Sequence, residues 1–228
     1  MYGTIDRLSP EAPVPVFVPQ HEETHRGMVG NVEENLLALG CDVGLVTLPG
    51  SIKTRFIDVR SNQHIMRLDQ DAANEPIVLN TTIPPIYDAV VISDYNKGCI
   101  SYELVEQVLK QFSGPVFIDT KKTDLERFEG AFVKINSLEY SLAKTVPSNL
   151  IVTLGKGGTT YAGITYPAVA VEVADVCGAG DTFLAALVYE YLNTGDIPTA
   201  IAFANRAAAV TVKHMGVYAP KLKEINEA

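Results

Sequence analysis

Four short apolar runs from Tyr87 onward constrain the fold of the chain more than any other feature. They read YDAVVISDY, GPVFIDT, AFVKIN and NLIVTLG. A run that stays apolar over this length is typical of a strand buried on both faces, because a half-exposed strand alternates apolar and polar residues. Helical segments follow several of them: SYELVEQVLKQF, which opens at the N-cap candidate Ser101, then DTFLAALVYEYL and PTAIAFANRAAAVTVKHMG. This alternation predicts an α/β fold with a parallel sheet flanked by helices and with ligand sites at the carboxyl ends of its strands.

The part of the chain before these runs has a different character. PVPVFVP alternates apolar residues with prolines, and IKTRFIDVRSNQHIMRLD is rich in β-branched and polar residues. Both patterns are typical of exposed strands in a small sheet. Between them, NVEENLLALG repeats apolar residues at helical spacing and ends at Gly40, a C-cap candidate. We therefore expect a mostly β lid over residues 1–70, including one core helix at about 30–40, and an α/β core over residues 71–228.

Composition argues against several classes of function. The 228 residues carry 18 Lys and Arg against 27 Asp and Glu, a formal charge of −9, so affinity for nucleic acid or for an anionic membrane surface is not expected. Cys41, Cys99 and Cys177 have no metal-ligand spacing and suggest no disulfide framework. The N-terminus lacks the pattern of a signal peptide, and no apolar run approaches the roughly 20 residues of a membrane span. A cytoplasmic protein is expected.

The stretch EVADVCGAGDTFLAAL, residues 172–187, carries the clearest chemistry. GAGD lies where an extended stretch meets a helix that is expected to start near Asp181. The unhindered backbone of Gly178, Ala179 and Gly180 can present N–H groups at the positive end of that helix, which makes an anion cradle. A carboxylate beside a bound anion suits removal of a proton from a hydroxyl that attacks phosphate, so Asp181 is a candidate general base. On these four residues alone, a glycine turn with Asp181 as a plain N-cap is an equal alternative.

Further motifs favour the catalytic interpretation. DVCGAGDTF resembles the C-terminal signature of the ribokinase, or phosphofructokinase-B, family of sugar kinases, which implies that Asp181 is the catalytic base. NSLE resembles the family's Asn-x-x-Glu element, which orders Mg²⁺ and its waters near the phosphates. VTLGKGG resembles the strand and turn that carries the nucleotide, and FANRAAAVTVKHMG resembles the helix and loop beside the adenine. The resemblance thus implies ATP and Mg²⁺ as cofactors, residues 71–228 as a nucleotide-binding core, a metal role for Asn136 and Glu139, and nucleotide contacts from Lys134, Thr153, Gly155, Gly158, Asn205 and Gly216.

Strings outside these motifs narrow the resemblance. RLSPEAPVPVF, RSNQHIMRLDQ, ISDYNKG and FIDTKKTDLERF are similar to the kinase domain of bacterial enzymes that phosphorylate heptose 7-phosphate at its anomeric hydroxyl. The implied acceptor is D-glycero-D-manno-heptose 7-phosphate, with ATP as donor. The resemblance places Asp94 and Lys97 in the sugar cleft, Lys121 near a phosphate, and Arg60, Asn62, Gln63 and Arg67 on the lid. A solvated strand face explains Arg60 and Arg67 equally well. Lid strands pair between subunits in related kinases, so a homodimer is also implied.

The chain departs from the family pattern on the sugar side. It starts after the family's first core strand, whose aspartate holds sugar hydroxyls. The sugar-side glycine element is GMVGN, in which Gly27, Gly30 and Asn31 are the candidate substrate residues and Met28 replaces a glycine. A methionine there would crowd a sugar that approaches the backbone closely. Segments are also expected to be missing between VGLVTLPG and SIKTRF and between LAKTVP and SNLIVTLG.

Two classes of function therefore remain open. The first is a compact, active small-molecule kinase that uses Asp181 as base. Within this class, another sugar phosphate or a nucleoside is the main rival to heptose 7-phosphate. The second is a degenerate member that folds and dimerises and retains nucleotide binding at most. Retention of Asp181, Asn136 and Glu139 favours the first class, whereas the missing aspartate and Met28 favour the second.

Overall fold

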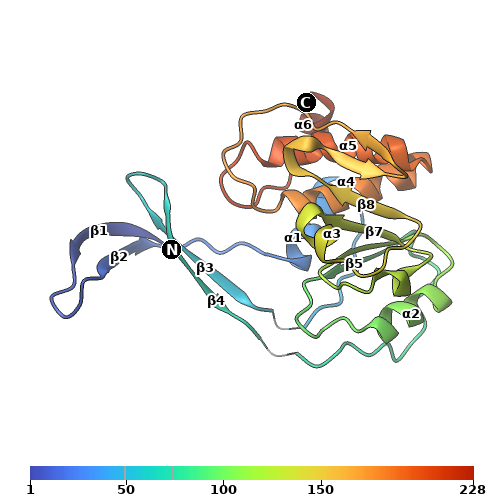
Figure 1. The fold of residues 1–228 in the computed structure, drawn as a ribbon, viewed down its shortest axis with the longest axis horizontal. Coiled ribbons are helices and arrows are strands. Elements are labelled where there is room, and N and C mark those ends of the chain that lie inside the picture. The colour runs from blue at the N-terminus through green and yellow to red at the C-terminus, as the bar shows by residue number, and fades with distance from the viewer. Residues whose placement is uncertain (49, 73) are drawn as a thin grey trace. The chain divides into compact units, whose positions relative to one another are not determined.

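The computed structural model describes residues 1–48, 50–72 and 74–228. The chain forms two compact units (Figure 1). The smaller unit consists of Met1–His25 and Leu48–Asn74, and the larger consists of Arg26–Thr47 and Glu75–Ala228. The boundary that we drew near residue 70 and the function assigned to each part stay predictions.

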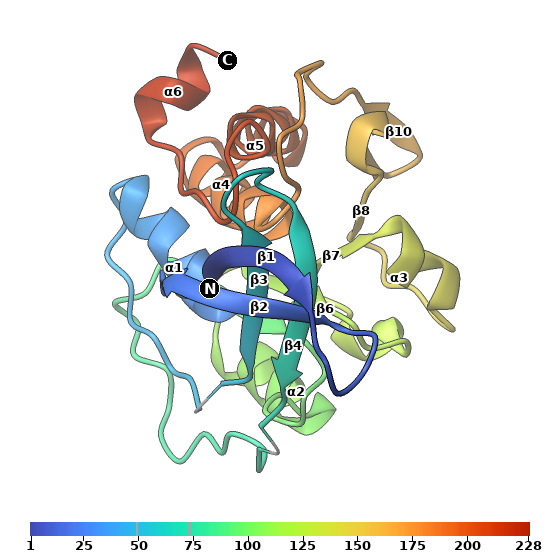
Figure 2. The ribbon, with the colours of Figure 1, turned by 90° about the vertical axis from the view of Figure 1, so that its left-hand side faces the viewer.

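The smaller unit is a four-stranded sheet in the order β2-β1-β3-β4 (Figure 2). Its strands are β1 (Tyr2–Leu8), β2 (Pro15–His21), β3 (Ile52–Asp58) and β4 (His64–Gln70). β1 runs antiparallel to β2 and parallel to β3, and β3 and β4 are antiparallel. The sequence predicted β2, β3 and β4. It did not predict β1, which lies between β2 and β3 and therefore has a pairing partner on each side.

The larger unit is built on a six-stranded sheet in the order β10-β9-β8-β7-β6-β5. The four apolar runs are its four parallel strands, as predicted: β5 (Val90–Asp94), β6 (Val116–Thr120), β7 (Phe132–Asn136) and β8 (Leu150–Thr153). β9 (Thr159–Tyr161) and β10 (Ile164–Tyr166) extend the sheet as an antiparallel hairpin. The carboxyl ends of the parallel strands meet at one edge of the sheet.

The described residues form six helices, of which four match segments that the sequence indicated and two, at residues 137–142 and 222–226, were not predicted. They are α1 (Val29–Ala38), α2 (Tyr102–Gln111), α3 (Ser137–Leu142), α4 (Ala179–Thr194), α5 (Ile197–Thr211) and α6 (Leu222–Asn226), with 3₁₀ turns at Leu125–Phe128 and Gly155–Gly157. The Ser101 side chain accepts a hydrogen bond from the Leu104 amide, which confirms the predicted N-cap. Gly40 has a φ of 89° directly after α1, as a residue that ends a helix does. α4 starts at Ala179, two residues before the predicted start, because Gly178 takes the capping position.

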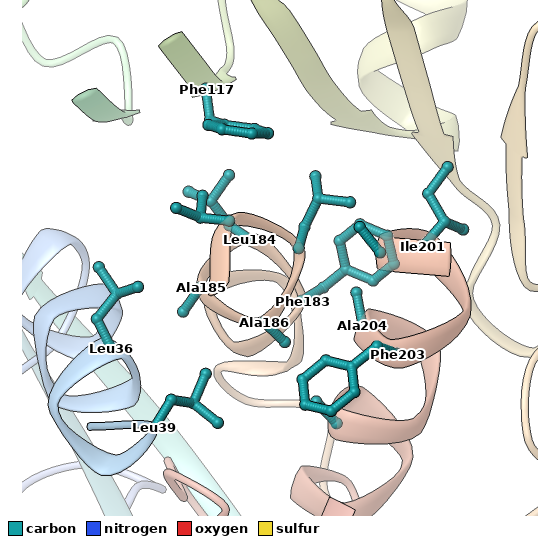
Figure 3. Packing of buried hydrophobic residues seen from close by; sticks show 14 of the residues in the cluster. Leu36, Leu39, Phe117, Phe183, Leu184, Ala185, Ala186, Ile201, Phe203 and Ala204 are labelled. Atoms are coloured by element: carbon teal, nitrogen blue, oxygen red, sulfur yellow. The ribbon is translucent and has the colours of Figure 1, made fainter. Parts of the chain in front are cut away.

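The helices bury both faces of the parallel sheet. Phe117 of β6 points to one face and contacts the cluster formed by α1, α4 and α5, in which α4 lies between the other two (Figure 3). Its neighbour Ile118 points to the other face and contacts the cluster that includes Val105 and Val108 of α2. Adjacent residues of one strand are therefore both buried, which is the physical reason for the continuous apolar runs. Among the described residues, no helix is both long and apolar enough to cross a membrane.

Candidate active site

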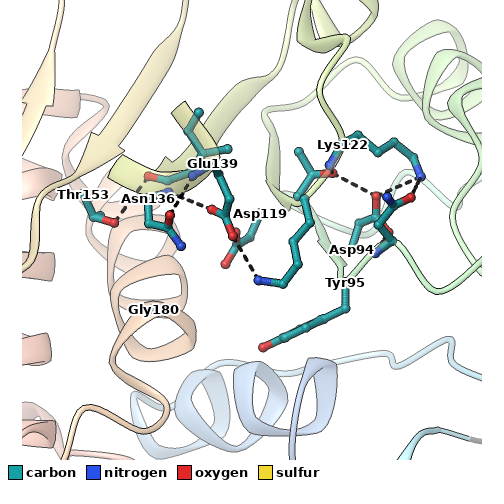
Figure 4. Close-up of polar contacts among 12 residues, drawn as sticks. Asp94, Tyr95, Asp119, Lys122, Asn136, Glu139, Thr153 and Gly180 are labelled. Carbon is teal, nitrogen blue, oxygen red and sulfur yellow. Dashed lines mark hydrogen bonds and ion pairs between the residues drawn. The ribbon is translucent and has the colours of Figure 1, made fainter. Parts of the chain in front are cut away.

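A group of polar side chains of the larger unit lies where its parallel strands end (Figure 4). Asp94 and Thr120 are paired in register at the ends of β5 and β6, and Asn136 and Thr153 are paired at the ends of β7 and β8. A cleft of about 140 Å³ opens at this edge and meets the start of α4. It is lined by Asp94, Tyr95, Asp119, Lys121, Lys134, Asn136, Glu139, Gly178, Gly180 and Asp181. Eight of these ten residues were predicted from the sequence as site residues.

Asp181 is buried at the start of α4, with only 7% of its surface exposed. Its Oδ2 accepts a hydrogen bond of 2.9 Å from Nδ2 of Asn31, and its Oδ1 accepts one of 2.9 Å from the phenol of Tyr95. Burial raises the pKa of the Asp181 carboxyl above its ordinary value, and these two hydrogen bonds oppose that rise. The carboxyl is thus held by two neutral donors and takes up a proton more readily than an exposed aspartate does.

The glycines before Asp181 provide the space that this arrangement needs. Gly178 has a φ of 76°, and a Cβ there would lie 2.8 Å from Nδ2 of Asn31, the amide that donates to Asp181. A Cβ on Gly180 would lie 3.0 Å from Nζ of Lys134. The N–H of Ala179 donates to the carbonyl of Val176 at 3.3 Å, so this predicted cradle amide already has an acceptor.

Lys134 connects the sheet to the start of α4. Its ammonium group is 2.8 Å from Oδ2 of Asp119 on β6 and donates to the Gly180 carbonyl at 3.3 Å. The side chain is only 5% exposed, so its charge is shielded from water and acts on the cleft at short range. The predicted residue is therefore in the cleft, at the boundary between the strand ends and the glycine turn.

Asn136 and Glu139 form a capping box at the start of α3. Oδ1 of Asn136 accepts from the Glu139 amide at 2.9 Å, and Oε2 of Glu139 accepts from the Asn136 amide at 2.7 Å. Oε1 of Glu139 also pairs with Lys121 at 2.9 Å. Within residues 1–48, 50–72 and 74–228, no group of three or more His, Cys, Asp or Glu side chains is arranged to hold a metal ion. This donor set fits Mg²⁺ that keeps several waters and takes its other ligands from phosphates.

Asp94 lies in the cleft lining, but its oxygens are committed to the protein. Oδ2 is 3.2 Å from Nζ of Lys122 and accepts from the hydroxyl of Thr120 at 2.9 Å. Oδ1 accepts from the Asn96 amide at 2.8 Å. Lys97, predicted beside Asp94, is half-buried and lies outside the described cleft lining. The Asp94 carboxylate thus anchors the loop that carries Tyr95.

Sequence reasoning missed Tyr95, Asp119 and Lys122. Tyr95 directly follows Asp94, and the other two belong to the string FIDTKK, from which only Lys121 was predicted. The available signal was their position at the ends of two buried strands, where parallel sheets place ligand-binding groups.

The predicted nucleotide residues lie outside the described cleft lining, with the exception of Lys134. The Thr153 hydroxyl donates to the Ile135 carbonyl, across the β7–β8 ladder from Asn136. Gly155 and Gly158 have φ values of 57° and 87° in the turn after β8. Asn205 joins α5 to the β9–β10 hairpin by accepting from Thr159 and donating to the carbonyls of Tyr166 and Pro167, and the Gly216 amide donates to Asp175.

The predicted sugar residues divide between the two units. Gly27, Gly30 and Asn31 belong to the larger unit, and of these Asn31 contacts Asp181. Arg60, Asn62, Gln63 and Arg67 belong to the smaller unit. Arg60 pairs with Asp6 at 2.9 Å, and Arg67 donates twice to Asp69, at 2.7 and 2.9 Å. The described structure therefore supplies both arginines with partners inside their own sheet, and their predicted role in binding a substrate stays a prediction.

Solved structures with this architecture define the class of fold. The chain matches a nucleoside kinase of Methanocaldococcus jannaschii, described as an archaeal member of the ribokinase family, with a TM-score of 0.70 and 18% identity over 99% of this chain and 93% of that one. It matches a ribokinase of Thermotoga maritima with a TM-score of 0.67 and 17% identity over 99% of this chain and 94% of that one. The fold is therefore ribokinase-like, as predicted.

A model of the pfkB family carbohydrate kinases matches residues 89–224, which is more than half of the chain. The chain belongs to this family. It is 35% identical to the bifunctional protein HldE of a Nitratiruptor species over an alignment of 285 positions that covers all of this chain and 62% of the relative. It is 30% identical to the bifunctional protein HldE of Bradyrhizobium diazoefficiens, over 95% of this chain and 57% of that protein.

The chain spans about three fifths of the length of these relatives. The first alignment runs over 285 positions, whereas the chain has 228 residues, so about 57 positions (285 − 228) have no residue from this chain. This difference supports the prediction that internal segments of the family scaffold are missing.

Proposed function

We propose that this chain transfers the γ-phosphoryl group of ATP to a hydroxyl of a sugar or sugar phosphate, with heptose 7-phosphate as the acceptor. The observation that carries the proposal is the buried Asp181 carboxylate, held by neutral donors at the start of α4 in a cleft that also contains Lys121 and Lys134. Phosphoryl transfer to an alcohol requires a base, a cleft that an anion can enter and nearby cations.

The reaction follows from these parts. Asp181 takes the proton of the acceptor hydroxyl as the hydroxyl oxygen forms a bond to the γ-phosphorus. The bond between that phosphorus and the bridging oxygen of ADP breaks, and ADP leaves with the electron pair. The ammonium groups of Lys121 and Lys134 and the amides of Gly180 and Asp181 in α4 stabilise negative charge on the phosphoryl oxygens as it moves.

Asn136 and Glu139 would hold Mg²⁺ through its water ligands. When bound, the ion neutralises charge on the phosphates. The capping box fixes both side chains in advance, because each oxygen that it uses is bonded to a backbone amide of the partner residue. Lys121, which lines the cleft and pairs with Glu139, would contact a phosphate of the bound nucleotide or acceptor.

The choice of acceptor rests on sequence likeness. The strings that resemble heptose 7-phosphate kinases and the relatives named bifunctional protein HldE support it. A neighbour of similar fold from Burkholderia thailandensis is a nucleoside kinase solved with inosine, so a nucleoside is the rival acceptor to test.

A specific observation favours the second candidate, a degenerate member of the family without transfer activity. Met28, which replaces a family glycine, has a φ of 57° and a ψ of −131° at the start of α1. This backbone region suits glycine and costs other residues on the order of 1–3 kcal/mol. The backbone at Met28 thus has a conformation that suits glycine, but it carries the long side chain of methionine, three residues before Asn31.

The smaller unit supports a homodimer. Its sheet carries exposed apolar side chains, including Val18 on β2 and Met66 and Leu68 on β4, which are 49%, 55% and 46% exposed. Apolar surface on a small open sheet favours pairing with a second copy. Sedimentation of the chain should give a dimer, and Met66→Lys combined with Leu68→Lys should shift it to the monomer.

The first test is ATP consumption with Mg²⁺ over heptose 7-phosphate, other sugar phosphates, free sugars and nucleosides, with ATP binding measured by calorimetry. The proposal expects turnover that depends on heptose 7-phosphate. ATP binding without turnover for any acceptor would support the degenerate candidate. In that case the variant Met28→Gly restores the glycine. Regained turnover would show that the Met28 side chain blocks an otherwise intact sugar site, and no regained turnover would show that the sugar site is lost.

A further inference from the structure

Two neutral donors from different elements hold the Asp181 carboxylate. Asn31 comes from α1 and bonds to Oδ2, whereas Tyr95 comes from the loop after β5 and bonds to Oδ1, each at 2.9 Å. The ring of Tyr95 extends across the cleft toward the start of α4 (Figure 4). An aspartate carboxylate rotates broadly about its last torsion, so one donor on each oxygen fixes the plane in which a proton is accepted.

The charged groups that face Asp181 are paired with each other. Asp119 on β6 and Lys134 on β7 form one pair at 2.8 Å. Lys121 after β6 and Glu139 on α3 form another at 2.9 Å. Both lysines act on Asp181 as charges across the cleft, but their direct ion pairs in the described structure are with other carboxylates. The hydrogen bonds from Asn31 and Tyr95 are therefore the direct restraints on Asp181.

We propose that Tyr95 is a positioning residue for phosphoryl transfer, whose phenol orients the Asp181 carboxylate and favours its ionised form. This inference rests on the proposed function for its catalytic consequence, because it assigns Asp181 the role of base. Its structural part, the effect of Tyr95 on Asp181, stands without any acceptor.

Tyr95 is suited to donate a proton in a hydrogen bond and unsuited to give it up. Burial raises the pKa of its phenol well above the ordinary value, and the charges of Asp181 and Asp119 raise it further. The phenol therefore stays protonated. Its ring also lies under the Lys121 ammonium, at 5.2 Å from the centroid, which restricts ring movement from the other side.

The backbone beside Tyr95 is held in place. Asn96, the next residue, has a φ of 55°, a conformation that asparagine tolerates better than most residues. Its amide donates to Asp94, whose carboxylate is anchored by Thr120 and Lys122. The phenol is thus presented from a loop fixed by a buried ion pair, which is the rigid support that a positioning group needs.

A neutral donor suits a general base better than an ammonium group would. A hydrogen bond to the ionised carboxylate opposes the effect of burial and keeps the group deprotonated near neutral pH. A direct ion pair would lower the pKa much further and reduce the tendency of the carboxylate to take a proton. Loss of the phenol should therefore raise the pKa of Asp181 and also release its orientation.

The test compares Tyr95→Phe with the wild-type chain and with Tyr161→Phe, which removes another partly buried phenol, on β9 outside the cleft lining. In Tyr95→Phe we expect kcat at neutral pH to fall roughly tenfold. The acidic limb of the kcat/KM profile should move to higher pH by about one unit. Tyr161→Phe should match the wild type in both.

A second readout uses no acceptor. The carboxyl carbon of Asp181, labelled with ¹³C and assigned by its loss in Asp181→Asn, is titrated by NMR in the wild type and in Tyr95→Phe. The titration should move to higher pH in Tyr95→Phe. An unchanged titration overturns the inference, and so does a variant that changes only the KM of the acceptor, because such a phenol binds substrate. A moved titration in a chain that turns over no acceptor keeps the positioning effect and refutes the proposed function alone.

Discussion

Asp94 and Asp181 are both buried carboxylates of the same cleft, with 4% and 7% of their surface exposed, but they are held in opposite ways. Asp94 forms an ion pair with Lys122, which is itself 9% exposed, whereas Asp181 is bonded to an amide and a phenol. The Asp94 carboxylate is thus occupied by a charged partner, whereas the carboxyl of Asp181 has neutral donors and remains able to take a proton. Because both carboxylates are buried, their bonding partners distinguish the structural one from the reactive one.

The largest effect is expected from replacing Asp181, the carboxylate that we propose to be reactive. Asp181→Asn keeps the size of the side chain but removes the base, so we expect acceptor-dependent turnover to fall by roughly 10³-fold. The measurement is kcat with saturating ATP and acceptor, beside calorimetry of ATP binding, which should be retained. A variant with more than a tenth of wild-type turnover would show that Asp181 is not the base.

Replacing Asp94, the carboxylate with a structural role, should lower stability. Asp94→Asn leaves the Lys122 ammonium buried without its anion, so we expect unfolding free energy to fall by about 3 kcal/mol. Chemical denaturation measures this loss. The double variant Asp94→Asn with Lys122→Met should lose less, because it removes the orphaned charge. If the double variant is the less stable of the two, the ion pair is not the main role of Asp94.

The sequence revealed the local parts of this site and missed those that depend on distant contacts. GAGD and NSLE are short patterns that resemble family motifs, so Asp181, Asn136 and Glu139 could be named from that resemblance. Tyr95 meets Asp181 across 86 positions of the chain, and Asn31 meets it across 150. Such contacts follow from how α1, the β5 loop and α4 meet, which no local pattern encodes.

The fold was predictable for a related reason. Each apolar run encodes burial on both faces of its own strand, so β5 to β8 could be identified one at a time. β1 was missed because TIDRL mixes polar and apolar residues, and its status as a strand comes from pairing with β2 and β3. The capping box was also missed: the pattern that suggested a metal role for Asn136 and Glu139 is equally the start signal of α3.

A smaller effect is expected from replacing Gly178, which leaves space for the Asn31 amide that donates to Asp181. Gly178→Ala forces alanine to adopt a positive φ, at about 1–2 kcal/mol of stability, and pushes its Cβ against the Asn31 amide. Gly195→Ala, at the other end of α4, has a similar φ of 68° with no atom within 4 Å of the added Cβ. Gly178→Ala should lose at least as much stability in denaturation as Gly195→Ala, but only Gly178→Ala should also lose turnover. Equal turnover in the two variants would show that the approach to Asn31 does not matter.

The smallest expected effect is a pH dependence of the unfolding free energy that comes from Asp181. Because burial raises the pKa of Asp181, the folded chain binds a proton there more readily than the unfolded chain does. This group therefore contributes its stability at low pH and loses it as pH rises through the folded-state pKa. Asp181→Asn has no such loss, so its unfolding free energy should exceed that of the wild type near pH 8 and the excess should shrink toward pH 4, near the ordinary aspartate pKa of about 3.9. Denaturation of both chains across this range measures the difference. An excess that grows toward low pH would mean that the donors Asn31 and Tyr95 outweigh burial in setting the pKa of Asp181.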